Sequence, residues 1–148
     1  HTWEDGKKHF ISQDFADMLG WKELASKVDS IYISIADKNH TLIICDNYGQ
    51  AGAINYYAKV AGIKADCFNT DYDKWVNLDN EIKTVIRIKE AKNLSSTRDL
   101  SLFASINEVA KIDNKFAREN GTRIAILSQP KLDLAKLLRA ERAKGNLR

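Results

Sequence analysis

An apolar stripe with helical spacing is the clearest pattern near the start of the chain. Its members follow one another at intervals of three and four positions: Trp21, Leu24, Val28, Ile31 and Ile35. This spacing places all five on one face of a helix, with Lys22, Glu23 and Asp29 on the opposite face. The pattern predicts an amphipathic helix over residues 20–36.

A continuous apolar run with the length of a strand follows. Residues 41–45 read Thr-Leu-Ile-Ile-Cys between polar neighbours, which is typical of a central strand covered on both faces. Residues 46–52 then open a second helix. Its packed face and C-terminal cap are expected at Ala51, Ile54, Ala58, Ala61 and Gly62. Further strands at residues 65–68 and 84–88 complete a βαβ pattern with a parallel crossover.

The second half of the chain has a less regular pattern. Residues 99–105 suggest a short helix, and residues 109–113 alternate as a strand does. Asn120-Gly121 has the composition of a tight turn, so residues 109–113 and 122–127 are expected to pair antiparallel. A helical turn at residues 115–119 is expected to precede this tight turn. A last helix follows Pro130 and carries Leu134, Leu137 and Leu138.

These elements predict an α/β domain with three layers, in which helices flank a mostly parallel, Rossmann-like sheet. Residues 1–13 are interpreted as an arm and residues 14–148 as a single domain. The chain has 148 residues, 44% hydrophobic, with one Pro, seven Gly and two Cys, which excludes collagen and disulfide scaffolds. No apolar run approaches the roughly 18–20 residues of a membrane helix, so a soluble domain is expected. Because the chain begins at His1 without Met, we expect it to be processed or part of a longer protein.

Charge and cysteine content add little to this prediction. The net charge is +3, of which the last eighteen residues carry +4 and the rest of the chain −1. In such a basic C-terminal helix a solvated face is more typical than a phosphate-binding one. No nucleic-acid partner is expected, because aromatic residues are not interleaved with these charges. Cys45 and Cys67 form no metal set with the scattered histidines, so we expect no metal, no cofactor and buried free thiols. A single disulfide between them is the alternative, if their strands are neighbours.

Candidate chemistry is concentrated in loop 46–52, at the end of the first strand. Ligands of open α/β sheets bind beyond the carboxyl ends of strands, and a helix N-terminus there suits an anion. The candidate binding residues are Asp46, Asn47, Tyr48, Gly49 and Gln50. The glycines form only G-x-x-G, so a structural role is the alternative: Gly49 for a turn and Gly52 for close packing of helix on sheet.

A second loop, residues 69–75, combines carboxylates with aromatic side chains. Asp71, Tyr72 and Asp73 precede Trp75, a combination that binds sugars in some proteins and forms hydrated turns in others. The sequence contains no legible Ser-His-Asp or Cys-His arrangement. We therefore assign no catalytic residue.

Four short stretches form an ordered set of motifs. Residues 15–24 read FADMLGWKEL, residues 47–54 NYGQAGAI, residues 112–120 IDNKFAREN and residues 129–131 QPK. In order and spacing they resemble the FAD-x-x-GW-x-E, NYGEAGAL, x-x-N-x-YARE and x-PK segments of bacterial protein-mannosyltransferase-like and aminoarabinose-transferase-like membrane glycosyltransferases. The resemblance covers most of the chain.

The resemblance implies the extracytoplasmic (periplasmic) C-terminal domain of a polytopic enzyme that moves a sugar from a polyprenyl-phosphate carrier to an acceptor. Such enzymes keep the catalytic carboxylate in the membrane portion, so this chain is expected to be non-catalytic by itself. The implied partners are that membrane portion and a glycan or lipid-linked acceptor. Gln50 replaces an acid of the family, and a GHN-x-Y-x-x-W stretch keeps only Asn69, Tyr72 and Trp75, which join the candidate binding residues.

Two other functions are compatible with the sequence. A free-standing soluble α/β domain would bind a nucleotide-like or sugar ligand at loop 46–52. An interaction module would place the basic C-terminal helix against anionic lipid headgroups.

Overall fold

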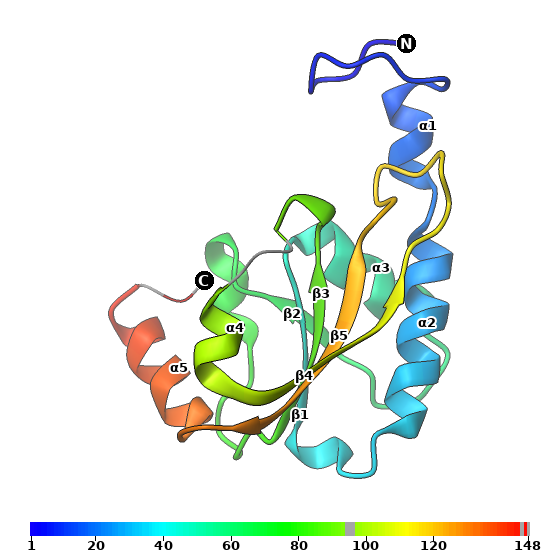
Figure 1. The fold of residues 1–148 in the computed structure, drawn as a ribbon. Helices are drawn as coiled ribbons and strands as arrows, with labels where there is room; N and C mark the ends of the chain where they lie inside the picture. Colours follow the sequence, from blue (N-terminus) through cyan, green and yellow to red (C-terminus); the bar gives the residue numbers. More distant parts are fainter. Residues whose placement is uncertain (94–96, 146, 148) are drawn as a thin grey trace.

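A five-stranded mixed sheet forms the centre of the fold in the computed structural model, which describes residues 1–93, 97–145 and 147 (Figure 1). The strands lie in the order β2-β1-β3-β5-β4. Their bounds are Thr41–Cys45 for β1, Ala65–Cys67 for β2, Thr84–Lys89 for β3, Phe103–Lys111 for β4 and Arg123–Pro130 for β5. The helices are α1 (Gln13–Met18), α2 (Trp21–Ser34), α3 (Tyr48–Tyr57), α4 (Thr97–Leu102) and α5 (Leu134–Ala143).

The direction of β5 decides the character of the sheet. β1 runs parallel to β2 and β3, whereas β5 runs antiparallel to both β3 and β4. The antiparallel ladders align six and seven positions, against three and five in the parallel ladders. The expected α/β fold with flanking helices is confirmed, but the sheet is mixed rather than mostly parallel. The reason is that β5 inserts between two strands of one direction, so a single reversed strand makes both antiparallel ladders.

The pairing of β4 with β5 confirms the predicted antiparallel pair. Residues 112–122 connect the two strands, too short a segment for the helical crossover of about a dozen residues that a parallel pair needs. Gly121 has a φ of +85°, which glycine adopts without a steric penalty. The boundary before β4 differs from the prediction: α4 ends at Leu102 and the strand begins at Phe103, within the expected helix 99–105. The expected helical turn at 115–119 is an irregular turn.

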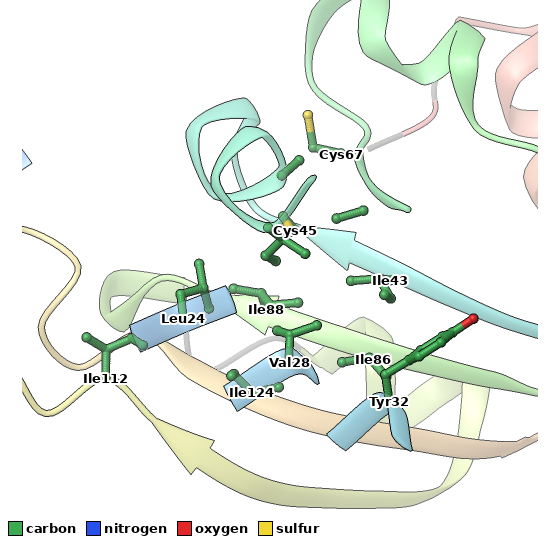
Figure 2. Close-up of a cluster of buried hydrophobic side chains, with 13 residues drawn as sticks. Leu24, Val28, Tyr32, Ile43, Cys45, Cys67, Ile86, Ile88, Ile112 and Ile124 are labelled. Carbon is green, nitrogen blue, oxygen red and sulfur yellow. The ribbon is translucent and has the colours of Figure 1, made fainter. Parts of the chain in front are cut away.

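Alternate residues of the strands face two separate cores. On one face α2 and α3 cover the sheet, and their apolar side chains meet those of the strands (Figure 2). This core includes Leu24, Val28, Ile43, Ile54, Ile86, Ile88 and Ile124. On the opposite face α5 packs through Leu134, Ala135 and Leu138 on Ile44, Val85 and Leu127. The predicted stripe of helix α2 is confirmed, because Leu24 and Val28 are fully buried.

Helix α3 ends earlier than its sequence suggests. It stops at Tyr57, so Ala61 is exposed and Gly62 lies in the following loop instead of capping the helix. Two side chains form hydrogen bonds with the backbone after Tyr57 and hold it in a non-helical conformation. The Asp29 carboxylate accepts hydrogen bonds from the N–H groups of Lys59 and Val60 at 3.0–3.1 Å. Asn55 exchanges two hydrogen bonds with the backbone of Ala65, at 2.9 and 2.7 Å.

The two cysteines lie side by side at the ends of neighbouring strands. Cys45 of β1 is in register with Cys67 of β2, and both are buried free thiols, as expected. Burial raises the pKa of both thiols, so they stay protonated at neutral pH. Neither cysteine is therefore an activated nucleophile.

Two glycines, Gly20 and Gly52, provide a test of the backbone conformation and the local packing in the structure. Replacing Gly20 by Ala is expected to cost about 1–2 kcal/mol, because its φ of +87° disfavours a side chain. The added Cβ would also lie 3.1 Å from Cβ of Ala117. Gly52→Ala is the matched control: Gly52 lies in helix α3 with nothing within 4 Å of an added Cβ, so the change should stabilise by about 0.5–1 kcal/mol. Urea unfolding measures both, and equal effects would contradict the structure.

Candidate functional site

The candidate site lies at the carboxyl ends of β1 and β3. From β1 the chain passes through α3 to β2 on one side, and later returns to β3 on the other side of β1. This reversal of strand order is a topological switch point, where open α/β sheets bind their ligands. Residues 46–50 leave β1 at this point, as the sequence predicts.

Asp46 connects the ends of β1 and β3. Its carboxylate accepts a hydrogen bond from Nη2 of Arg87 at 2.6 Å and another from the backbone N–H of Glu90 at 2.7 Å. Arg87 also donates to the carbonyls of Ile44 and Ile88. Only 8% of the Asp46 side chain is exposed. Asp46, a predicted binding residue, therefore holds the strand ends together.

Asn47 and Gln50 form the cap of helix α3. The Asn47 side chain accepts from the Gln50 N–H at 2.8 Å, and Gln50 Oε1 accepts from the N–H groups of Asp46 and Asn47. This capping box explains why the residues after β1 start a helix. The Gln50 side chain is completely buried, and its Nε2 donates to Oε2 of Glu119 at 2.8 Å. Gln50 thus ties the helix to the β4–β5 connection.

A pocket of about 510 Å³ opens beside this cap. Four segments of the chain line it: helices α1 and α2, the start of α3, the residues after β3, and the β4–β5 connection. Their lining residues are Asp17, Trp21, Asn47, Tyr48, Gly49, Arg118, Glu119, Asn120 and Thr122, joined by Glu90, Ala91 and Lys92 after β3. Tyr48 is 62% exposed at the pocket.

Two acids of the pocket, Glu90 and Glu119, are in different environments. Glu90 accepts from Nδ2 of Asn47 at 2.6 Å and pairs with Lys92 at 3.0 Å. Glu119 is only 9% exposed, and its Oε2 accepts from both Gln50 Nε2 and Thr122 Oγ1 at 2.8 Å. Its second carboxylate oxygen, Oε1, has no hydrogen-bond partner among the residues that the structure describes. Glu119 therefore brings a largely buried negative charge to the pocket wall.

The cations of the pocket are paired with acids. Arg118 lies 3.1 Å from Asp17, and Lys92 lies 3.0 Å from Glu90. Burial alone lowers the pKa of Arg118, but the hydrogen bond and charge of Asp17 outweigh it, so the pKa is raised. Among the described residues, the pocket lining thus has three acids and two bases.

Sequence reasoning missed several residues of the pocket. Trp21, Glu90, Arg118 and Glu119 were not among the candidates, because each lies outside loops 46–52 and 69–75. Three of them are in motif stretches, so the ordered motif set was the available indication. Glu90 follows β3, whose carboxyl end lies beside that of β1.

The second predicted loop joins the site through one residue. Asn69 Nδ2 donates to the Asp46 carbonyl at 2.6 Å, and Asn69 lines a smaller pocket of about 250 Å³ with Asp46 and Arg87. Trp75 is 72% exposed in the 3₁₀ helix η2 (Thr70–Trp75). The Tyr72 side chain is outside the described part of the structure. Among the described side chains, Asn69 is thus the link between the two loops.

The glycines of loop 46–52 have roles other than those predicted. Gly49 does not adopt a positive φ; a Cβ there would lie 3.5 Å from the Trp21 ring and 3.2 Å from Asn47 Oδ1. Gly52 is exposed and has nothing within 4 Å of an added Cβ, so it does not permit close packing on the sheet. The close approach in this loop belongs to Gly49.

The basic C-terminal helix uses two of its cations inside the protein. Arg139 donates to the Leu78 carbonyl at 2.6 Å, and Arg142 donates to the Val76 carbonyl at 2.8 Å. These bonds attach α5 to the loop before β3. Arg139 and Arg142 are therefore packed against the protein and are not part of the solvated helix face that the sequence suggested.

Comparison of the chain with protein-family models, with curated proteins and with solved structures finds no match. Within the described residues, no helix has the length and apolarity to cross a membrane. The same residues contain no group of three or more His, Cys, Asp or Glu side chains placed to hold a metal ion.

Proposed function

We propose that this chain is the non-catalytic, extracytoplasmic C-terminal domain of a membrane glycosyltransferase related to the protein-mannosyltransferase-like and aminoarabinose-transferase-like enzymes. The parent enzyme would transfer a sugar from a polyprenyl-phosphate carrier to an acceptor. One observation carries the proposal: three of the four motif stretches, 15–24, 47–54 and 112–120, meet in one pocket. Motifs that matched by chance would have no reason to gather there.

The fourth motif stretch has a different position. Gln129-Pro130-Lys131 lies where β5 ends. Because β5 is antiparallel to β3, this is the end of the strands opposite to the pocket. Helices on both faces of the sheet support, within this proposal, the finer description as a three-layer, Rossmann-like domain. The proposed partner of the pocket is the membrane portion of the enzyme or its glycan acceptor.

Tyr48 provides the test of this function. Replacing Tyr48 by Ala in the full-length enzyme is expected to lower the rate of sugar transfer about tenfold, the loss of roughly 1.4 kcal/mol of aromatic contact. Thermal unfolding of the domain should change little, because Tyr48 is 62% exposed. The readout is the transfer rate in membranes that contain equal amounts of each variant.

Tyr56→Ala is the matched control, because Tyr56 lies on the same helix, is 80% exposed and is not part of the pocket wall. It should transfer sugar at the wild-type rate. A Tyr48→Ala enzyme that does the same would remove the pocket from the function.

A further inference from the structure

We propose that the 510 Å³ pocket binds a neutral sugar unit through Tyr48, Trp21 and the Glu119 carboxylate. The inference rests on the proposed function for the origin of the sugar, which would be a glycan of the acceptor. The binding chemistry itself follows from the walls of the pocket.

Two aromatic residues, Tyr48 and Trp21, line the pocket. Gly49 follows Tyr48 in the chain, and the Trp21 ring lies 3.5 Å from the position that a Cβ of Gly49 would occupy. Any larger residue at position 49 would crowd this ring. One face of a sugar ring carries mainly C–H groups, which pack on aromatic surfaces, while its hydroxyls point outward. Tyr48 offers such a surface, because most of its side chain is exposed.

Hydrogen-bond acceptors line the pocket as well. Oε2 of Glu119 is occupied by Gln50 and Thr122, whereas Oε1 has no partner among the described residues. An unpartnered carboxylate oxygen forms a strong hydrogen bond with a donor in the pocket, because its negative charge assists the bond. Sugar hydroxyls are such donors. Glu90 adds further acceptor atoms to the pocket lining, since carboxylate oxygens accept more than one hydrogen bond.

The charges of the pocket favour a neutral ligand over an anion. Asp17, Glu90 and Glu119 outnumber Arg118 and Lys92, and both cations already pair with acids. At the start of helix α3, the N–H group of Gln50 is occupied by the Asn47 side chain. A phosphate would therefore meet more negative than positive charge. This disfavours the anion and nucleotide ligands that the sequence alone suggested for loop 46–52.

The test is an NMR titration of the ¹⁵N-labelled 148-residue chain. The probes are methyl glycosides of glucose, galactose and mannose, with inorganic phosphate and ATP as anionic comparators. At least one glycoside is expected to give saturable shifts at the backbone amides of Tyr48, Gly49 and Asn120 and at the Trp21 indole N–H. Shifts at these groups with phosphate or ATP alone, or with none of the probes, would overturn the inference.

Two variants test the assigned contacts. Glu119→Gln keeps the shape and leaves an amide oxygen to accept from Gln50 and Thr122, so its NH₂ group replaces the acceptor Oε1 in the pocket. It is expected to weaken glycoside binding about tenfold. Tyr48→Ala should weaken binding to a similar extent, and Tyr56→Ala should bind as the wild type does. Circular dichroism melting confirms that each variant is folded; folded variants with wild-type affinity would contradict the assigned contacts.

The two proposals fail in different ways. If no glycoside binds but Tyr48→Ala still lowers transfer in the full-length enzyme, the sugar site is wrong and the domain's role in transfer stands. If glycosides bind at the pocket but Tyr48→Ala leaves transfer unchanged, the sugar site stands and its part in transfer is wrong.

Discussion

Replacing Gln50 by Glu is expected to destabilise the folded chain by about 3 kcal/mol at pH 8. Gln50 is completely buried, and its Nε2 lies 2.8 Å from Oε2 of Glu119. Glu at this position would place a second carboxylate against the first, and two adjacent buried carboxylates share a single proton below a raised pKa. The change is nearly isosteric, so its effect measures charge and hydrogen bonding rather than packing.

The cost of Gln50→Glu should depend on pH in a defined direction. A carboxyl pKa that is raised in the folded state means that the folded protein binds its proton more tightly than the unfolded chain does. The destabilisation relative to wild type is therefore smallest in acid, grows as the pH rises through the raised pKa, and is constant above it. Urea unfolding at pH 5 and pH 8 measures this difference. A deficit that is equal at the two pH values would contradict a charge clash.

Glu119→Gln provides the compensating change. Combined with Gln50→Glu it leaves one carboxylate and one amide in the pair, with donor and acceptor exchanged. The double variant should recover about 2 kcal/mol of the loss at pH 8, because the second charge is gone. Glu119→Gln alone should change stability little. If the double variant is as unstable as Gln50→Glu, the buried pair is not the cause.

Replacing Arg87 by Met is the second change with a large expected effect, a loss of about 3 kcal/mol in the free energy of unfolding. The guanidinium pairs with the Asp46 carboxylate at 2.6 Å and donates to the carbonyls of Ile44 and Ile88. Met keeps an unbranched apolar side chain but is shorter and offers no donor. Asp46, with a side chain only 8% exposed, then loses the charge of Arg87.

Arg123→Met is the matched control on the neighbouring strand. Arg123 pairs with Glu108 at 3.0 Å, but its side chain is 36% exposed and that of Glu108 is 51% exposed. Exposed pairs contribute about 0.2–1 kcal/mol, so this variant should stay within 1 kcal/mol of wild type in urea unfolding. Similar losses for both arginines would contradict the special position of Arg87 at the strand ends.

The parts of the fold that the sequence predicted are those with a local pattern. The run 41–45 is strand β1 without any shift of its bounds, and the stripe from Trp21 onward is helix α2. Both follow from the spacing of apolar residues along a single element. The insertion of β5 between β3 and β4 has no such local pattern, because strand order depends on contacts between distant segments. The early end of α3 likewise depends on Asp29, a residue of another helix.

The sequence predicted the position of the candidate site but not most of the residues that form it. Loop 46–52 does lie at the strand ends, yet Asp46 and Gln50 turn inward because their polar groups satisfy the strand ends and the start of a helix. Glu119 reaches the pocket from the β4–β5 connection, 69 residues further along the chain than Gln50. Only the tertiary fold brings such residues together.

The coding sequence upstream of His1 provides the most direct test of the central claim, that this chain is the C-terminal domain of a membrane glycosyltransferase. The account predicts an open reading frame that encodes several apolar spans of about 20 residues, the last of them ending shortly before His1. A start codon or a cleavable signal peptide immediately before His1 would contradict it.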